Sequence, residues 1–183
     1  MNISVFCGSS MPHNPEIAVA ARDLGRQLAL AGHTLLYGGS NLGLMGVVSG
    51  AALEAGGHVV GVIPNLFSDD IILSQPVTEL VRVASMAERK EYLIAHSDAF
   101  VALPGGIGTI DEISEVMVAN QLGKVCGHAP TAKPMILLNI NGFYNAFLEQ
   151  LRHIHDEGLM RTTGGLVAVD SVQEVLDYLV ELV

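Results

Sequence analysis

The sequence predicts an α/β fold, in which a mainly parallel, doubly wound sheet is covered by helices on both faces. Short apolar runs rich in Val, Ile and Leu alternate with longer segments of helical period, which is typical of parallel strands joined by crossover helices. The runs are apolar at almost every position, as expected of strands buried on both faces. The length of 183 residues, with no linker or internal repeat, suits one domain over residues 1–183.

Each predicted element rests on this alternation of periods. The short apolar runs predict strands at Ile3–Cys7, Thr34–Tyr37, Val59–Ile63, Glu79–Val83, Ala99–Leu103, Met135–Asn139 and Leu166–Val169. The segments of helical period predict helices at Pro15–Ala31, Gly43–Ala55, Met86–Ser97, Ile110–Leu122, Phe143–Glu157 and Val172–Val180. Such sheets bind ligands beyond the carboxyl ends of the strands, so function is expected in the strand-to-helix loops.

Charge and hydropathy exclude several classes of partner. Nineteen acidic residues against nine basic ones give a net charge of −10, which disfavours binding to nucleic acid or to an anionic membrane surface. No apolar run reaches the ~18 to 20 residues of a membrane span, and the N-terminus lacks the basic start of a signal peptide. We therefore expect a cytoplasmic protein.

The cysteines and histidines predict no disulfide framework, no metal site and no cofactor. Cys7 and Cys126 are too few for a framework, and neither lies in a cluster with zinc-ligand spacing. His153 and His155 are two residues apart and so lie on different faces of a helix. Cys7 ends an apolar strand, where a cysteine is more often a small buried hydrophobe than a nucleophile.

Three loops after predicted strands are rich in Gly and Ser. They are Cys7–Ser10, Gly38–Gly43 and Pro104–Thr109, and all three lie at the same end of a parallel sheet. Exposed main-chain N–H groups and small hydroxyls in such loops suit a phosphate or another anion. An alternative is that the glycines only close tight corners. Neither a Walker A loop nor the dinucleotide fingerprint is present.

Glu112 lies within one turn of the loop Pro104–Thr109. With Thr109 it forms a Thr-x-x-Glu capping box, which is a purely structural interpretation of both residues. The alternative is a chemical role. A carboxylate close to a bound phosphate is electrostatically unfavourable, so its presence there would need a function, such as chemistry at a ribose. Asp111 is expected to interact with the helix dipole.

Arg89 and Lys90 form the only adjacent basic pair. They follow a second capping box, formed by Ser85 and Glu88. Helical spacing places Arg89 beside Leu93, on a face that should turn inward. Arg89 is then either a solvated, snorkelling side chain or a pocket residue whose guanidinium is aimed at phosphate or at a reacting nucleotide.

With these motifs in hand, the chain resembles the LONELY GUY family of cytokinin riboside 5′-monophosphate phosphoribohydrolases, often mislabelled as lysine decarboxylases. Pro104 to Glu112 matches the family signature Pro-Gly-Gly-x-Gly-Thr-x-x-Glu at every fixed position. Order and spacing agree over nearly the whole chain, at Cys7–Ser10, Tyr37–Gly39, Gly43–Gly46, Gly61–Pro64 and Ser85–Lys90.

The resemblance implies a Rossmann-like homodimer that hydrolyses the N-glycosidic bond of a nucleoside 5′-monophosphate. The products are adenine or an N6-substituted adenine and ribose 5-phosphate. Arg89 and Glu112 match the catalytic residues of the family. The implied substrate contacts are Ser9, Gly38, Gly39, Met86, Arg89, Lys90, Gly105, Gly106, Gly108 and Thr109.

The chain departs from the family pattern at three places. Ala87 follows Met86 where many relatives have histidine, and Ser40 replaces a third glycine. The segment 121–134 is longer than usual, which can reshape the base pocket. Two other functions stay open: a non-catalytic nucleotide carrier that uses the same loops, and a lysine decarboxylase. The latter needs a Schiff-base lysine from among Lys90, Lys124 and Lys133.

Overall fold

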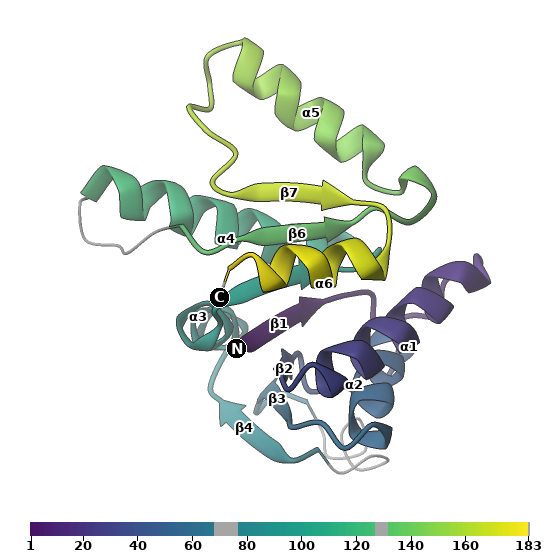
Figure 1. The fold of residues 1–183 in the computed structure, drawn as a ribbon. Coiled ribbons are helices and arrows are strands. Elements are labelled where there is room, and N and C mark those ends of the chain that lie inside the picture. The colour runs from purple at the N-terminus through teal and green to yellow at the C-terminus, as the bar shows by residue number, and fades with distance from the viewer. Residues whose placement is uncertain (68–76, 127–131, 183) are drawn as a thin grey trace.

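The protein is described by a computed structural model, which covers residues 1–67, 77–126 and 132–182. Within these ranges seven parallel strands form one sheet in the order β4-β3-β2-β1-β5-β6-β7 (Figure 1). The strands are β1 Asn2–Phe6, β2 Thr34–Tyr37, β3 Val59–Pro64, β4 Glu79–Val83, β5 Ala99–Ala102, β6 Met135–Leu138 and β7 Leu166–Val169. Every predicted strand is confirmed, with ends that differ by at most one residue.

The order of the strands reverses beside β1. The chain builds β2, β3 and β4 outward on one side of β1, and then returns to place β5 on its other side. Ile3 to Phe6 of β1 pair in register with Ala99 to Ala102 of β5, so the loops after these two strands leave the sheet side by side. A crevice at such a reversal is where open α/β sheets bind ligands.

Helices cover both faces of the sheet (Figure 1). They are α1 Pro15–Leu30, α2 Gly43–Glu54, α3 Met86–His96, α4 Ile107–Cys126, α5 Asn145–Asp156 and α6 Val172–Val180. Alternate strand residues point to opposite faces, so Val5 packs with α1, α2 and α6, whereas Phe6 packs with α3, α4 and α5. The predicted doubly wound α/β class is therefore confirmed.

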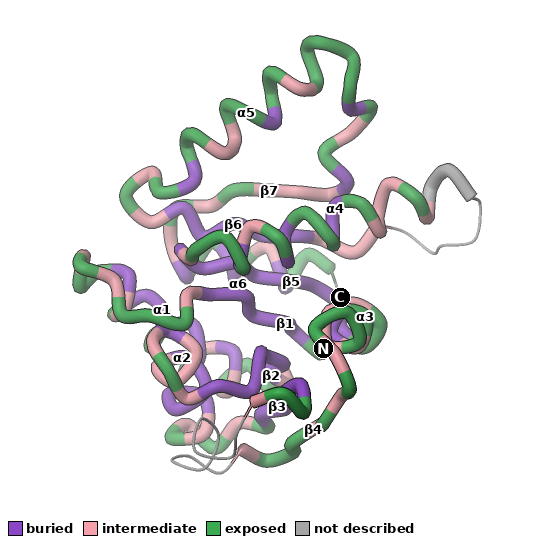
Figure 2. Tube along the Cα trace, turned by 180° about the vertical axis from the view of Figure 1, so that it is seen from behind, coloured by how far each residue is buried: buried purple, intermediate pink, exposed green. Residues whose placement is uncertain are grey.

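The central strands carry the core. In Figure 2 these strands are buried along their length, whereas the edge strands β4 and β7 include exposed and half-buried residues. This gradient explains the nearly continuous apolar runs at the centre of the sheet. Within the described residues, no helix has both the length and the apolar character needed to cross a membrane. The cytoplasmic location stays a prediction.

Two helices begin elsewhere than the sequence predicts. Helix α4 starts at Ile107 instead of Ile110, because the N–H groups of Thr109 and Ile110 both donate to the Gly106 carbonyl. Helix α5 starts at Asn145 instead of Phe143, because a separate 3-10 turn, η2 (Ile140–Gly142), precedes it. Asn141 in this turn has a φ of 52°, which interrupts the helix. The long segment 121–134 lies partly outside the described residues.

Candidate active site

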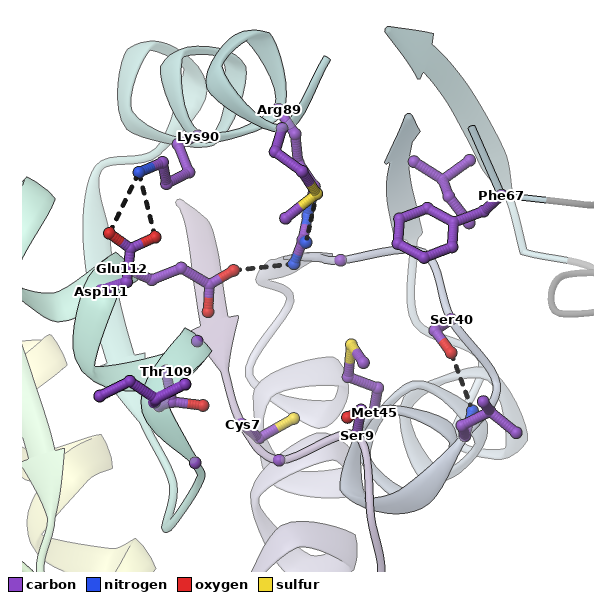
Figure 3. A pocket seen from close by; sticks show the side chains of 18 residues that line it. Cys7, Ser9, Ser40, Met45, Phe67, Arg89, Lys90, Thr109, Asp111 and Glu112 are labelled. Atoms are coloured by element: carbon purple, nitrogen blue, oxygen red, sulfur yellow. Dashed lines mark hydrogen bonds and ion pairs between the residues drawn. The ribbon is translucent and has the colours of Figure 1, made fainter. Parts of the chain in front are cut away.

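A pocket of about 460 Å³ lies at the carboxyl ends of the strands, where the chain order reverses. Its walls come from the loops after β1, β2, β3 and β5 and from the first turns of α3 and α4 (Figure 3). The three Gly- and Ser-rich loops singled out in the sequence therefore meet in one place.

Main-chain contacts hold these loops together. Gly8 donates its N–H to the Pro104 carbonyl over 3.4 Å, and Leu44 at the start of α2 donates to the Gly8 carbonyl over 3.0 Å. Gly43 has a φ of +57°, and a Cβ at this position would lie 2.4 Å from the Ser9 carbonyl carbon. Only glycine permits this approach, which explains the glycine at the start of α2.

The loop Pro104–Thr109 presents open backbone to the pocket. A Cβ at Gly106 or Gly108 would meet no atom within 4 Å, and both residues line the cavity at the start of α4. At Gly105, by contrast, a Cβ would lie 2.1 Å from Thr109 Oγ1, so this glycine lets the turn close on the Thr109 side chain. The result is a helix N-terminus bordered by free space, which suits an anion.

The capping-box interpretation of Thr109 and Glu112 is wrong. Because α4 begins at Ile107, Thr109 lies inside the helix, and Glu112 directs its carboxylate away from the helix end to Arg89. The expected role of Asp111 at the helix dipole is also wrong, since α4 has no acidic residue in its first turn.

Arg89 and Glu112 form an ion pair inside the pocket. Arg89 Nη2 donates to Glu112 Oε1 over 2.7 Å, and the two side chains are only 12% and 10% exposed. Figure 3 shows the guanidinium extending from α3 toward the carboxylate. The solvated interpretation of Arg89 is therefore wrong. Arg89 Nε is buried and has no hydrogen-bond partner within the described part of the chain, so its capacity to donate is unused in the structure.

Burial dominates the titration of Glu112. Loss of hydration raises the pKa of its carboxyl to about 7; the Arg89 charge opposes this shift, Asp111 adds to it, and Lys90 opposes it. The carboxyl can therefore change protonation state near neutral pH, which is a common property of acid–base groups in active sites.

Lys90 faces Asp111 and Glu115 on α4. Its Nζ lies 3.0 Å from Asp111 Oδ2 and 2.9 Å from Glu115 Oε2. Hydrogen bonds to Glu115 and then to Asp111 raise the pKa of Lys90, so this side chain remains charged. Arg89 and Lys90, consecutive on α3, thus bind the consecutive acids Glu112 and Asp111 on α4.

The second capping box, at Ser85, is confirmed. Glu88 donates its N–H to Ser85 Oγ over 3.1 Å, and the Glu88 carboxylate accepts from the N–H of Ala84 over 2.8 Å. This cap starts α3 immediately before Arg89 and Lys90. It therefore fixes the turn of helix from which both cations reach α4.

The structure brings most of the predicted contact residues to the pocket. Those that line it are Ser9, Gly38, Met86, Arg89, Lys90, Gly106, Gly108 and Thr109. Gly39 and Gly105 do not line it. Gly39 has a φ of +76° and packs against Ile63, while Gly105 packs against Thr109. Their roles as ligand contacts stay predictions, and in the structure they shape the loops behind the wall.

One wall of the pocket is apolar and was not predicted. It is formed by Leu42, Met45, Ile63 and Phe67. In Figure 3, Phe67 and Met45 stand across the pocket from Lys90 and Asp111, so a charged wall faces an apolar one. Part of this wall could be found from the sequence, because Leu42 lies in the loop after β2, Ile63 lies near the end of β3 and Phe67 lies just beyond it, whereas Met45 belongs to the first turn of α2.

Cys7 lies on the pocket floor and is buried, as predicted. Burial, followed by the charge of Glu112, raises the pKa of its thiol well above the usual range, and Arg89 only partly opposes this. The thiolate is therefore disfavoured. Among the residues that the structure describes, no group of three or more His, Cys, Asp or Glu side chains is placed to hold a metal ion.

Fold and site together define a Rossmann-like α/β protein whose polar pocket lies where the strand order reverses. The family model described as "possible lysine decarboxylase" matches residues 45–179. The cytokinin riboside 5′-monophosphate phosphoribohydrolase LOG5 of Arabidopsis thaliana is 43% identical over 87% of this chain and 67% of its own length. A probable enzyme of the same name, LOGL3 of Oryza sativa, is 40% identical over 98% and 83%. The chain belongs to this LONELY GUY family.

Solved structures share the fold at lower identity. The molybdenum cofactor carrier protein of Chlamydomonas reinhardtii superimposes with a TM-score of 0.73, at 24% identity over 99% of this chain and 96% of its own. The molybdenum cofactor binding protein of Rippkaea orientalis gives a TM-score of 0.70, at the same identity and coverage. At this identity the likeness establishes the fold alone.

Proposed function

We propose that the protein hydrolyses the N-glycosidic bond of a cytokinin-type nucleoside 5′-monophosphate. The products are the free base, adenine or an N6-substituted adenine, and ribose 5-phosphate. The observation that carries the proposal is the buried Arg89–Glu112 pair beside the open glycine backbone at the start of α4. Relatives about 40% identical over most of the chain bear the name of this activity.

The phosphate is assigned to the start of α4. The backbone of Gly106 and Gly108 borders the open space there, and Thr109 lines the same part of the pocket. The positive end of the helix dipole favours the dianion. Fixing one end of the nucleotide places the ribose over Glu112 and supplies orientation to the reaction. The apolar wall at Met45 and Phe67 then faces the base.

Glu112 acts on the ribose. As the C1′–N bond breaks, its electron pair leaves with the base and the ribose gains positive charge, which an ionised carboxylate stabilises. The same carboxylate orients the water that forms the new C1′–O bond, and the proton that this water loses balances the proton that the departing base takes up. Arg89 holds the nucleotide and assists departure of the base, either directly or through an ordered water. Arg89 lines the pocket, which places its side chain beside the bound nucleotide in this proposal.

Release of base is the decisive measurement. Purified protein is incubated with AMP or with isopentenyladenosine monophosphate, and the free base is separated by chromatography. We expect base and ribose 5-phosphate in equal amounts. The alternative, a non-catalytic nucleotide carrier, predicts saturable binding of the same nucleotides with no base released on long incubation.

The described lysines do not fit a pyridoxal-dependent decarboxylase. Lys90 is engaged by Asp111 and Glu115, and Lys133 Nζ donates to the Ile94 and Ala95 carbonyls at the end of α3. The side chain of Lys124 lies outside the described residues. A pyridoxal absorbance band in the purified protein would support the decarboxylase instead.

We extend the proposal to a homodimer. Val118 and Leu122 on α4 are 53% and 56% exposed and offer an apolar surface for a second copy. Light scattering during gel filtration measures the state directly. A mass equal to one chain at micromolar concentration would contradict this part of the proposal.

A further inference from the structure

Lys90 offers little to a ligand. Its Nζ has three hydrogens, and it lies within hydrogen-bond distance of Asp111 Oδ1 and Oδ2 and of Glu115 Oε2. The Lys90 side chain is 17% exposed, and two carboxylates outweigh its single charge. In Figure 3 the ammonium points to Asp111 at the side of the pocket. A free phosphate would have to compete with both carboxylates for it.

Helix α3 contacts the core mainly through one short run of side chains. Leu93 is its only buried residue, with the half-buried Tyr92 and Ile94 beside it. At its C-terminal end, Lys133 Nζ donates to the Ile94 and Ala95 carbonyls over 2.7 and 3.1 Å. At the N-terminal end, near the pocket, Lys90 bonds to α4. The two lysines therefore fix the helix at opposite ends, and Lys90 acts at the end that carries Arg89, beside the Arg89–Glu112 pair itself.

We propose that Lys90 is a positioning residue, which holds α3 on α4 so that the Arg89 guanidinium meets the Glu112 carboxylate. This inference rests on the proposed hydrolysis and departs from the substrate contact that the family resemblance implies. Lys90 and Arg89 are consecutive, as are their acidic partners Asp111 and Glu112. Any shift of α3 along α4 that breaks one pair therefore misplaces the other.

A mutant cycle separates positioning from ligand contact. Its members are Lys90→Met, the double variant Asp111→Asn/Glu115→Gln, and the combination of all three changes. We expect Lys90→Met and the double variant each to lower kcat about tenfold, and the combination to lower it no further. Lys90→Arg, which keeps the charge and its carboxylate partners, should recover most of the rate.

A ligand contact predicts a different pattern. Lys90→Met would raise KM with kcat unchanged, and the double variant would match or exceed the wild-type rate because it frees the ammonium. That result overturns the proposal. The matched control is Lys133→Met, which loosens the far end of α3 and should keep the wild-type kcat. An equal loss of kcat in this control would also overturn a specific role for Lys90.

The pH profile of kcat/KM adds a second measurement. A role of Lys90 in stability alone would leave this profile unchanged. Within the described residues, the titratable and charged groups that interact with Glu112 are Arg89 and Lys90 from α3, Asp111 from α4, the Cys7 thiol after β1 and the Tyr144 hydroxyl just before α5. Removing the Lys90 charge and displacing Arg89 both disfavour the Glu112 carboxylate. The acid limb of kcat/KM should therefore move to higher pH in Lys90→Met and stay in place in Lys133→Met. An unmoved limb in Lys90→Met would contradict positioning.

Failure of the proposed function is distinguishable from failure of this inference. If the wild-type protein releases no base from any nucleotide, the hydrolase proposal fails. Calorimetry with AMP then replaces turnover as the readout. Positioning predicts that AMP binding weakens equally in Lys90→Met and in the double variant, whereas weakening in Lys90→Met alone overturns it.

Discussion

The Arg89 guanidinium lies so close to the backbone of Gly38 that position 38 has no room for a side chain. A Cβ at Gly38 would lie 2.3 Å from Arg89 Nη2 and 2.9 Å from Cζ. The guanidinium therefore passes directly over the backbone after β2 on its way to Glu112. This glycine gives the arginine room, in addition to lining the pocket.

Gly38→Ala should lower kcat between about 10-fold and 100-fold, because a displaced guanidinium no longer meets Glu112 or the substrate. Thermal unfolding should stay close to wild type, since the flexible end of Arg89 can move aside. Base release measured by chromatography tests the first point. On an Arg89→Ala background the same change should cost nothing further, and an additional loss there would assign Gly38 a role independent of Arg89.

Glu112→Gln should keep the fold and lower turnover by about 10² to 10⁴. The amide preserves shape and can still accept a hydrogen bond from Arg89, but it cannot stabilise the positive charge that develops on the ribose. Ribose 5-phosphate release measures the loss, and circular dichroism checks the fold. Turnover close to wild type would exclude Glu112 as the catalytic carboxylate.

The rate should depend on pH through Glu112. Its pKa is raised to about 7, and the ionised carboxylate is the active form in the proposed mechanism. As pH falls below this value the carboxyl binds a proton, so kcat/KM should drop roughly tenfold per unit, and above it the rate should level off. In Glu112→Gln the residual rate should lack this limb. A limb that persists in the variant belongs to another group.

Selectivity should depend on the phosphate. The open backbone at Gly106 and Gly108 and the start of α4 provide the anion site, so AMP should be hydrolysed far better than adenosine. The ratio of kcat/KM for the two compounds is the measurement. Equal rates would show that the helix end plays no part in binding.

Tyr144 supports the phosphate loop from behind. Its hydroxyl donates to the Leu103 carbonyl over 2.6 Å, directly before Pro104, and both residues are buried. Tyr144→Phe leaves that carbonyl without its donor, which should lower the free energy of unfolding by about 1 to 3 kcal/mol. Urea denaturation measures this. The half-buried Tyr178 on α6 offers a control, where the same change should have a much smaller effect.

The sequence was sufficient for the sheet and for the chemistry-bearing loops. Buried parallel strands appear in the sequence as apolar runs that are easily recognised. Gly106 and Gly108 belong to the motif Pro104–Glu112, which can also be recognised from the sequence alone. The start of α4 could not be predicted from the sequence. The N–H groups of Thr109 and Ile110 donate to the Gly106 carbonyl, so the helix begins without the side-chain cap that the sequence pattern suggests. The local pattern is compatible with a Thr109–Glu112 capping box, but Glu112 instead binds a tertiary partner, Arg89.

Contacts between distant residues account for the other differences. Nothing near Lys90 in the sequence indicates that Asp111 and Glu115 bind it, since these residues are 21 and 25 positions away. The apolar wall likewise brings together Met45 from the first turn of α2 and Phe67 from the segment after β3. These contacts depend on how the crossover helices and loops pack against the sheet. The periodicity of the sequence carries no information about this packing.

The placement of α3 and α4 on either side of β5 in the chain has an evolutionary consequence. The ion pair and its supporting bonds all come from one contiguous stretch, whereas the apolar wall comes from the segments after β2 and β3. In the proposed mechanism, bond cleavage depends mainly on the later stretch and choice of base on the earlier one, apart from Gly38, which gives Arg89 room. Substitutions in the apolar wall can therefore change which base is accepted, while Gly38 and the later stretch preserve the reaction.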